Sequence, residues 1–121
     1  NVMFPAELAR SPNAAADAEK LLERVGLSHR RRNMPHQLSG GEQQRVAICR
    51  ALINQPAIIF ADEPTGNLDS QSGQAILALM LEFQREFHTT LLMVTHNPDI
   101  ARQADTRFQL TDGRLDRSGD L

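Results

Sequence analysis

Two runs decide the fold of this chain: LSGGEQQR at residues 38–45 and AIIFADEP at residues 57–64. In the first run, Ser39 and Glu42 match the S-x-x-E capping box, in which each side chain bonds the other residue's backbone N–H, so a helix begins there. The second run is short and apolar from Ala57 to Ala61, as in a strand buried on both faces of a parallel sheet. This order predicts an α/β fold.

Further elements flank these runs. Apolar residues recur at helical spacing after Ser11-Pro12-Asn13, and Gly26 with Leu27 matches a left-handed helix cap. Beyond a short helix at Asn97-Pro98, residues 107–115 are expected to form a hairpin that turns at Asp112-Gly113. A long helix from about residue 70 to residue 87 should be followed by a buried strand at 91–94, and its own buried face is predicted to be Ile76, Leu79, Met80, Phe83 and Phe87.

Strand, helix and strand in succession predict a crossover on a parallel sheet. Ligands of such sheets bind at the carboxyl ends of the strands. Asp62 and Glu63 follow the first strand and His96 follows the second, so we expect the acid pair and the histidine at one rim.

The acid pair suits phosphoryl chemistry. Mg²⁺ on a nucleotide takes a carboxylate directly or through water, and a hydrolytic water needs a base within reach of its proton. We predict that Asp62 holds the metal and that Glu63 polarises the water, while His96 donates to a terminal phosphate oxygen. The alternative for the acids is a solvated strand end.

Ser39, Gly40 and Gly41 stand at the start of the helix predicted in the first run, where free N–H groups and the helix dipole favour an anion. Glycines let a phosphate approach the backbone, and the Ser39 hydroxyl can also donate. Gln43 belongs to the same run, and we include it among the predicted phosphate-binding residues. The alternative is an ordinary helix cap without a ligand.

Composition narrows the class of protein. The 121 residues include 40% hydrophobic and 23% charged residues, which is typical of a globular domain. The net charge of -2 gives no reason to expect nucleic acid as a partner. Cys49 cannot form an internal disulfide and is predicted to pack in the core, and the basic run His29–Arg32 is predicted to be solvated. No apolar run approaches the ~20 residues that span a bilayer.

In order and spacing, these motifs resemble the signature motif, the Walker B motif and the switch histidine of ABC-transporter nucleotide-binding domains. The run from Asp62 to Asp69 is similar to an exporter-type group that includes lipoprotein-releasing, macrolide-exporter and FtsE-like ATPases, with most likeness to the lipoprotein-releasing members. The resemblance implies the C-terminal part of a P-loop, RecA-like ATPase. Residues 1–54 would form its helical subdomain, and residues 55–121 part of its core with a terminal hairpin.

The resemblance also implies a mechanism. Two cassettes would stack head to tail as a homodimer and trap ATP and Mg²⁺ between them, with Asp62, Glu63 and His96 on one side. Ser39, Gly40, Gly41 and Gln43 would reach the ATP of the other subunit, and Asp69 would lie at the dimer contact. Integral membrane permease subunits would be the partners, at the cytoplasmic face of the inner membrane.

The phosphate-binding motif G-x-x-x-x-G-K-[ST] does not occur in the chain. We therefore expect a partial cassette that supplies half of each composite site and is inactive alone. Two alternatives stay open. One is a soluble ABC ATPase of DNA repair or translation, and the other is a non-catalytic module that docks on a partner's ATP.

Overall fold

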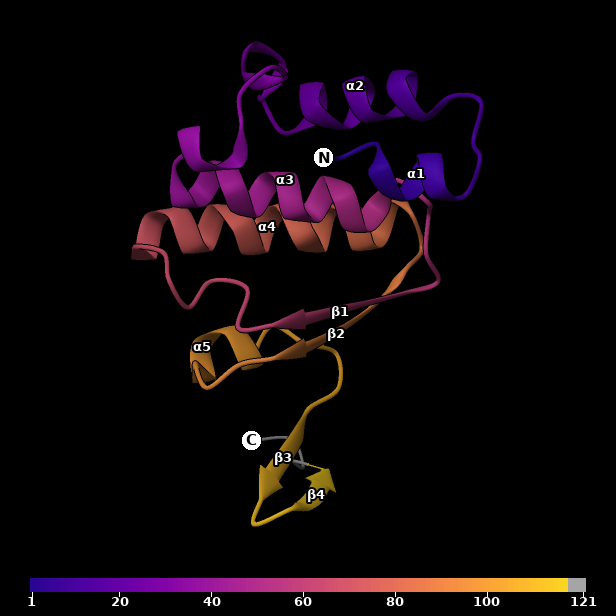
Figure 1. Ribbon diagram of the computed structural model, residues 1–121. Coiled ribbons are helices and arrows are strands. Elements are labelled where there is room, and N and C mark those ends of the chain that lie inside the picture. The colour runs from indigo at the N-terminus through magenta and orange to yellow at the C-terminus, as the bar shows by residue number, and fades with distance from the viewer. Residues whose placement is uncertain (118–121) are drawn as a thin grey trace.

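The computed structural model describes residues 1–117, which form layers of helices over a small sheet (Figure 1). The helices and strands are, in chain order, α1 (Phe4–Leu8), α2 (Ala14–Arg24), η1 (Ser28–Arg30), η2 (Pro35–Gln37), α3 (Gly40–Leu52), β1 (Ile58–Asp62), α4 (Ser70–Glu86), β2 (Thr90–Val94), α5 (Pro98–Ala101), β3 (Phe108–Thr111) and β4 (Arg114–Arg117). Helix α1, which begins at a proline-containing first turn, was not predicted.

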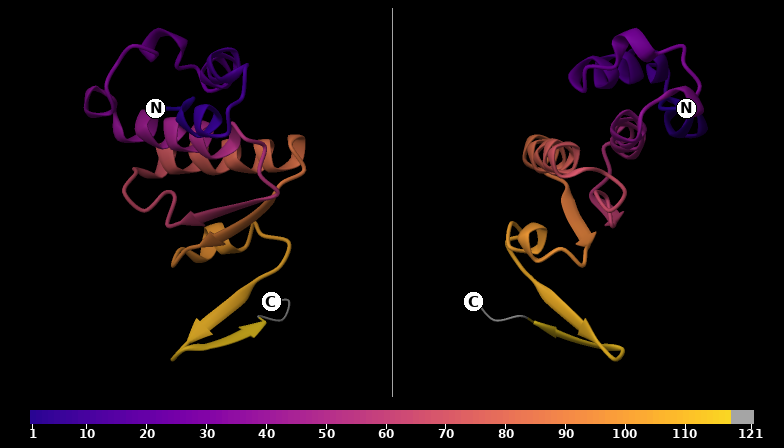
Figure 2. Two further views of the ribbon diagram at one scale, coloured as in Figure 1. Left: turned by 45° about the vertical axis from the view of Figure 1, so that its right-hand side comes forward. Right: turned by 90° about the vertical axis from the view of Figure 1, so that its left-hand side faces the viewer.

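Helices α3 and α4 lie side by side and form the central layer, with α1 and α2 on one side and β1 and β2 on the other (Figure 2). One apolar cluster joins these layers. Its largest fully buried side chains come from α4, from α3 and from the segment that follows α2: Phe83, Ile76, Cys49 and Leu27. The hairpin of β3 and β4 stands beyond α5, away from the helices (Figure 1).

The end of α2 confirms the predicted glycine cap. Gly26 has a φ of 74°, in the left-handed region that glycine adopts without penalty. The Leu27 N–H donates to the Leu22 carbonyl oxygen at 2.8 Å, and the Gly26 N–H donates to Glu23 at 3.0 Å. This is the Schellman pattern, in which the residue after glycine packs back against the helix. Leu27 is accordingly 1% exposed.

The buried face of α4 was predicted in part. Ile76, Met80 and Phe83 are buried as expected, whereas Leu79 and Phe87 are only partly buried. Leu77, which the prediction omitted, is also buried. The buried positions of the helix therefore span a wider arc than the predicted stripe.

Strands β1 and β2 are parallel, with Ile58 opposite Thr90 and Asp62 opposite Val94. The prediction that these strands are buried on both faces is wrong for the described residues. Exposure alternates along each strand, and Phe60 is 75% exposed. Residues 1–117 supply helices to one face of this sheet only, so the other apolar face meets solvent.

The terminal hairpin confirms its predicted turn. Strand β3 pairs antiparallel with β4, and Leu110 lies opposite Leu115. Asp112 and Gly113 have φ values of 48° and 77°, as a two-residue type I′ turn requires. Within the described residues, this hairpin forms a second sheet that is not hydrogen-bonded to β1 and β2.

An ion-pair cluster that the sequence did not predict joins α2 to α4. Both terminal nitrogens of Arg24 bond the Glu86 carboxylate at 2.7 Å, and one of them also bonds Glu82 at 3.0 Å. The same guanidinium lies 5.0 Å from the centre of the Phe83 ring. Bidentate geometry of this kind fixes an orientation better than a simple surface pair does.

Replacing Gly26 with alanine should destabilise the fold through the backbone alone. A Cβ at Gly26 would have no heavy atom within 4 Å, so no side-chain clash contributes. Holding an L-residue in the left-handed region costs about 1–2 kcal/mol. We expect Gly26→Ala to lower the free energy of unfolding by about this amount in urea denaturation. Gly26→Asn should lose less, because asparagine tolerates this conformation. An equal loss for both variants would contradict this explanation.

Candidate active site

Glu63 and His96 lie at the carboxyl ends of β1 and β2, on one rim as the sequence predicted, and the structure shows that they are in direct contact. The Glu63 Oε1 atom lies 2.7 Å from His96 Nδ1 and accepts the His96 backbone N–H at 2.8 Å. The Glu63 side chain is 33% exposed and that of His96 is 85% exposed. The pair therefore lies at the protein surface, where a ligand can reach it. The fold brings the two residues together from positions 33 apart in the sequence.

The backbone of Glu63 is as constrained as its carboxylate. Its φ is 44°, in a region that residues other than glycine, asparagine and aspartate rarely adopt. The Glu63 N–H donates to the Val94 carbonyl oxygen at 2.9 Å, and its own carbonyl accepts the Gly66 N–H at 3.0 Å. Such conformations persist where surrounding contacts over-determine them, and they are concentrated at functional sites.

Asp62 is the last residue of β1 and its side chain is exposed. Residues 1–117 contain no group of three or more histidine, cysteine, aspartate or glutamate side chains placed to hold a metal ion. Mg²⁺ does not require such a cage, since it usually keeps several waters and takes one or two carboxylates together with substrate phosphates. An exposed single carboxylate beside Glu63 fits that manner of binding.

The start of α3 confirms the predicted capping box. The Ser39 hydroxyl accepts the Glu42 N–H at 3.2 Å, and the Glu42 carboxylate accepts the Ser39 N–H at 3.0 Å. The bond from the Ser39 backbone lowers the pKa of Glu42, and Arg30 acts in the same direction. The second Glu42 oxygen accepts the Arg30 Nε–H at 3.2 Å. Arg30 was predicted to be solvated, so this contact corrects the description of the basic run.

Gly40 and Gly41 have different surroundings. A Cβ at Gly40 would lie 3.4 Å from a methyl group of Leu68, so the loop after Glu63 packs close to the helix end. A Cβ at Gly41 would have nothing within 4 Å. The described part of the fold therefore gives no steric reason for glycine at position 41, although glycine lowers helix stability.

The bonds of Gln43 do not support its prediction as a phosphate ligand. Its amide nitrogen donates to the Pro35 carbonyl oxygen at 2.9 Å and to that of Leu38 at 3.2 Å. An amide has two N–H groups, and both are directed at the backbone. Gln43 thus ties the loop that leads into α3 to the first turn of that helix.

Asp69 caps α4. Its carboxylate accepts the Ser72 N–H at 3.0 Å, and hydrogen bonding by the Ser72 side chain and then by this N–H lowers the pKa of Asp69. Asn97 caps α5 in the same manner by accepting the Asp99 N–H at 2.9 Å. The ends of both strands and the beginnings of α3 and α4 lie on one side of the molecule (Figure 1).

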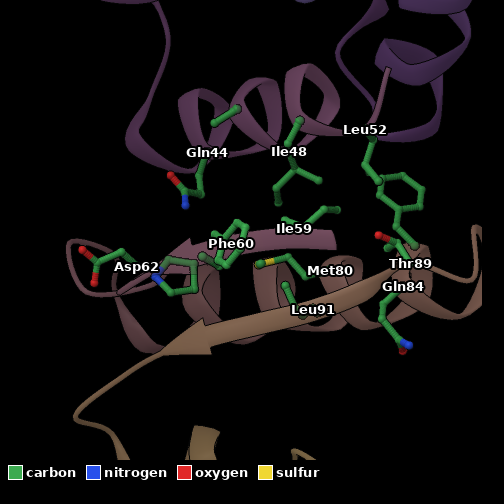
Figure 3. Close-up of a pocket in the computed structure, with 15 residues that line it drawn as sticks. Gln44, Ile48, Leu52, Ile59, Phe60, Asp62, Met80, Gln84, Thr89 and Leu91 are labelled. Carbon is green, nitrogen blue, oxygen red and sulfur yellow. The ribbon is translucent and has the colours of Figure 1, made fainter. Parts of the chain in front are cut away.

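A pocket of about 170 Å³ lies between α3, α4 and β1 (Figure 3). Its lining is mainly apolar, with Ile48, Ile59 and Met80 among the contributors. Asp62 reaches its edge, but Ser39, Glu63 and His96 are not part of its lining. Ser39, Glu63 and His96 therefore lie outside this pocket, and Asp62 alone connects it to the predicted site.

Cys49 packs in the core as predicted. It is fully buried, and its thiol lies 3.6 Å from the Leu21 carbonyl oxygen. Burial raises the pKa of Cys49 to about 11, so the thiolate is scarce at neutral pH. This excludes a nucleophilic role for Cys49 in the folded chain.

Among residues 1–117, no helix is both long enough and apolar enough to cross a membrane.

Comparison with known proteins agrees with this geometry. Residues 1–66 match the family model described as ABC transporter. The lipoprotein-releasing system ATP-binding protein LolD of Hydrogenovibrio crunogenus is 53% identical over 117 residues, which are 95% of this chain and 51% of that protein. The chain spans about half the length of the curated relatives it matches.

Solved structures show the same fold. CbiO1 from Clostridium perfringens, part of the transporter complex CbiONQ, superposes with a TM-score of 0.85 at 32% identity, covering 95% of this chain and 47% of that one. The cassette MJ0796, in a dimeric post-hydrolysis state bound to ADP and Pi, superposes with a TM-score of 0.77 at 36% identity. The match covers 99% of this chain and 56% of that one. The chain belongs to the ABC transporter family, and its fold is the α/β fold of part of an ABC ATPase cassette.

Replacing Asp69 should weaken α4 in a pH-dependent manner. Loss of an N-cap side chain destabilises a helix, so we expect Asp69→Ala to lower the free energy of unfolding at pH 7. Because folding lowers the pKa of Asp69, its contribution is present above the ordinary value of 3.8 and is lost as the pH falls through the lower folded value.

Urea denaturation at pH 7 and pH 2 measures this effect, with Asp69→Asn as the control. Asparagine retains a capping oxygen but does not titrate, so its advantage over alanine should be equal at both pH values. The advantage of aspartate over alanine should shrink at pH 2, and a constant advantage would contradict the assignment.

Proposed function

We propose that this chain is part of the ATP-hydrolysing subunit of an ABC transporter that powers release of lipoproteins from the inner membrane. Membership of the family and identity of about half with proteins named LolD support this proposal. The observation that carries the enzymatic part is the contact between Glu63 and His96 at the ends of two parallel strands. ATPases of macrolide exporters or of the FtsE type are the nearest alternatives.

Glu63 is the proposed general base. Its hydrogen bonds to His96 use the Oε1 atom. No group within residues 1–117 donates a hydrogen bond to Oε2, which can therefore accept a proton from water. Two bonds from one residue fix the direction of the carboxylate, and a fixed base is what proton transfer to an oriented water requires. When His96 Nδ1–H donates to Glu63, Nε2 is the ring atom that faces the ligand, and it donates to a phosphate oxygen only in the imidazolium form.

Asp62 is the proposed ligand of Mg²⁺. The metal supplies charge neutralisation for the phosphates when it is bound. Asp62 contributes an unshielded carboxylate next to the base, and its exposure leaves space for the waters that the ion keeps. The two acids thus take separate tasks because one ends the strand and the other begins the turn.

Ser39, Gly40 and Gly41 are the proposed phosphate-binding residues for ATP held by a second subunit. The open space around Gly41 supports this assignment, since a glycine stands in a helix where no contact in the described fold requires it. Backbone N–H groups at a helix start attract a phosphate, and a missing Cβ lets it approach. Gln43 enters the proposal as the residue that holds the preceding loop in place.

The rest of the assembly follows the family pattern. We propose that two cassettes form a homodimer with Asp69 near the contact, and that permease subunits anchor them at the cytoplasmic face of the inner membrane. In this arrangement residues 1–54 act as the helical subdomain and residues 55–121 as part of the ATP-binding core. The dimeric relative with ADP and Pi bound is consistent with nucleotide held between such cassettes.

Glu63→Gln tests the base. The assay uses a chimera in which this chain replaces the matching half of the Hydrogenovibrio crunogenus relative, because the chain covers half of that protein. Glutamine cannot take up the proton, so ATP turnover should fall at least ~100-fold, the low end of the contribution of a general base. ATP-dependent dimerisation, followed by size exclusion, should persist. Retained turnover would refute the assignment of Glu63.

Gly41→Ala tests the helix end as a phosphate site. Alanine favours a helix, so the stability of the chimera should be unchanged or higher by up to ~1 kcal/mol. Dimerisation by ATP in the Glu63→Gln background should nevertheless need at least about tenfold more ATP, because the added methyl group obstructs the phosphate. Gln74→Ala, an exposed change on α4, is the control. Equal ATP dependence in both variants would favour a helix cap without a ligand.

A further inference from the structure

The carboxylate of Glu42 lies in the first turn of α3, at the helix end that we propose for phosphate. A capping box needs only an oxygen acceptor at this position, and glutamine supplies one as well as glutamate does. Glutamate therefore brings a full negative charge that the cap does not need. That charge repels an incoming phosphate unless another group offsets it.

Arg30 is placed to offset this charge. Its Nε–H donates to Glu42 Oε2 at 3.2 Å, while Glu42 Oε1 is occupied by the Ser39 N–H. The Arg30 and Glu42 side chains are 41% and 19% exposed, so solvent screens this pair less than a fully exposed pair. The contact connects η1 to the first turn of α3 across the intervening loop.

The neighbouring arginines do not share this position. Arg31 bonds Glu19 on α2 at 3.0 Å, and both of these side chains are more than half exposed. Arg32 is exposed as well. The contacts thus single out Arg30, within the basic run 29–32, as the arginine that contacts the capping residue of α3.

We propose that Arg30 is a positioning residue for the nucleotide, which acts through Glu42 by neutralising the capping carboxylate and keeping the start of α3 receptive to a phosphate. This inference rests on the proposed function. Arg30 need not touch the nucleotide. Its effect should fall on the ATP concentration required and not on the chemical step, because the base and the histidine lie on the strand ends.

The experiment is a double-mutant cycle in the chimera described above, with Arg30→Met, Glu42→Gln and the two combined. Methionine keeps much of the length of the side chain without its charge. At low salt we expect Arg30→Met to raise the KM for ATP about 5- to 10-fold and to change kcat less than twofold. Glu42→Gln in addition should return the KM to within about twofold of the parent, since the cap is kept and the repelling charge is gone.

Two further measurements separate electrostatics from structure. Raising the salt concentration from about 50 to 500 mM should reduce the effect of Arg30→Met, because the Debye length falls well below ~10 Å. Arg31→Met is the matched control and should leave the KM unchanged. A purely structural role would instead lower Tm and would not be rescued by Glu42→Gln.

Several outcomes would overturn the inference: an unchanged KM in Arg30→Met, an equal effect of Arg31→Met, or a lack of rescue in the double variant. If Arg30→Met does not fold, Glu42→Gln alone remains decisive, because the inference requires its KM to be equal to or lower than that of the parent. A parent chimera that neither hydrolyses ATP nor dimerises with it would refute the proposed function itself, which is a distinct result.

Discussion

The site depends on the parallel register of β1 and β2. Glu63 fixes this register with both its backbone and its side chain. Its backbone N–H donates to the Val94 carbonyl oxygen, and its carboxylate accepts two bonds from His96. A shift of either strand by one residue would reverse which side chains face the helices and would separate these groups. The left-handed backbone of Glu63 is held by this pairing and by the turn to Gly66.

Helix ends form the other half of the proposed site. Helices α3 and α4 both begin on the side of the molecule where the strands end, and each has a side-chain cap, Ser39 or Asp69. The caps use some of the free N–H groups and leave others open, which is why a helix start can be stable and still attract an anion. Arg30 and Gln43 add bonds that hold the chain entering α3.

Local signals predicted the elements with repeating or capping patterns. The capping box at Ser39, the glycine at position 26 and the turn at Asp112-Gly113 all take the expected conformation, since each depends on residues within a few positions of one another. Burial was predicted less well. Phe60 and Leu92 look like core residues in sequence, yet both are exposed because no element within residues 1–117 covers that face.

The sequence by itself determined the family, the order of the α-helices and strands from α2 onward, and which acids and which histidine end the two strands, because these follow from short motifs and hydrophobic period. Only the tertiary structure decided the pairing of Glu63 with His96, of Arg30 with Glu42 and of Arg24 with Glu82 and Glu86. Charged residues are common on every surface, and sequence spacing carries no record of which surfaces meet. Packing of α2 against α4 around Phe83 brings Arg24 to Glu82 and Glu86, whereas the register of β1 and β2 brings Glu63 to His96.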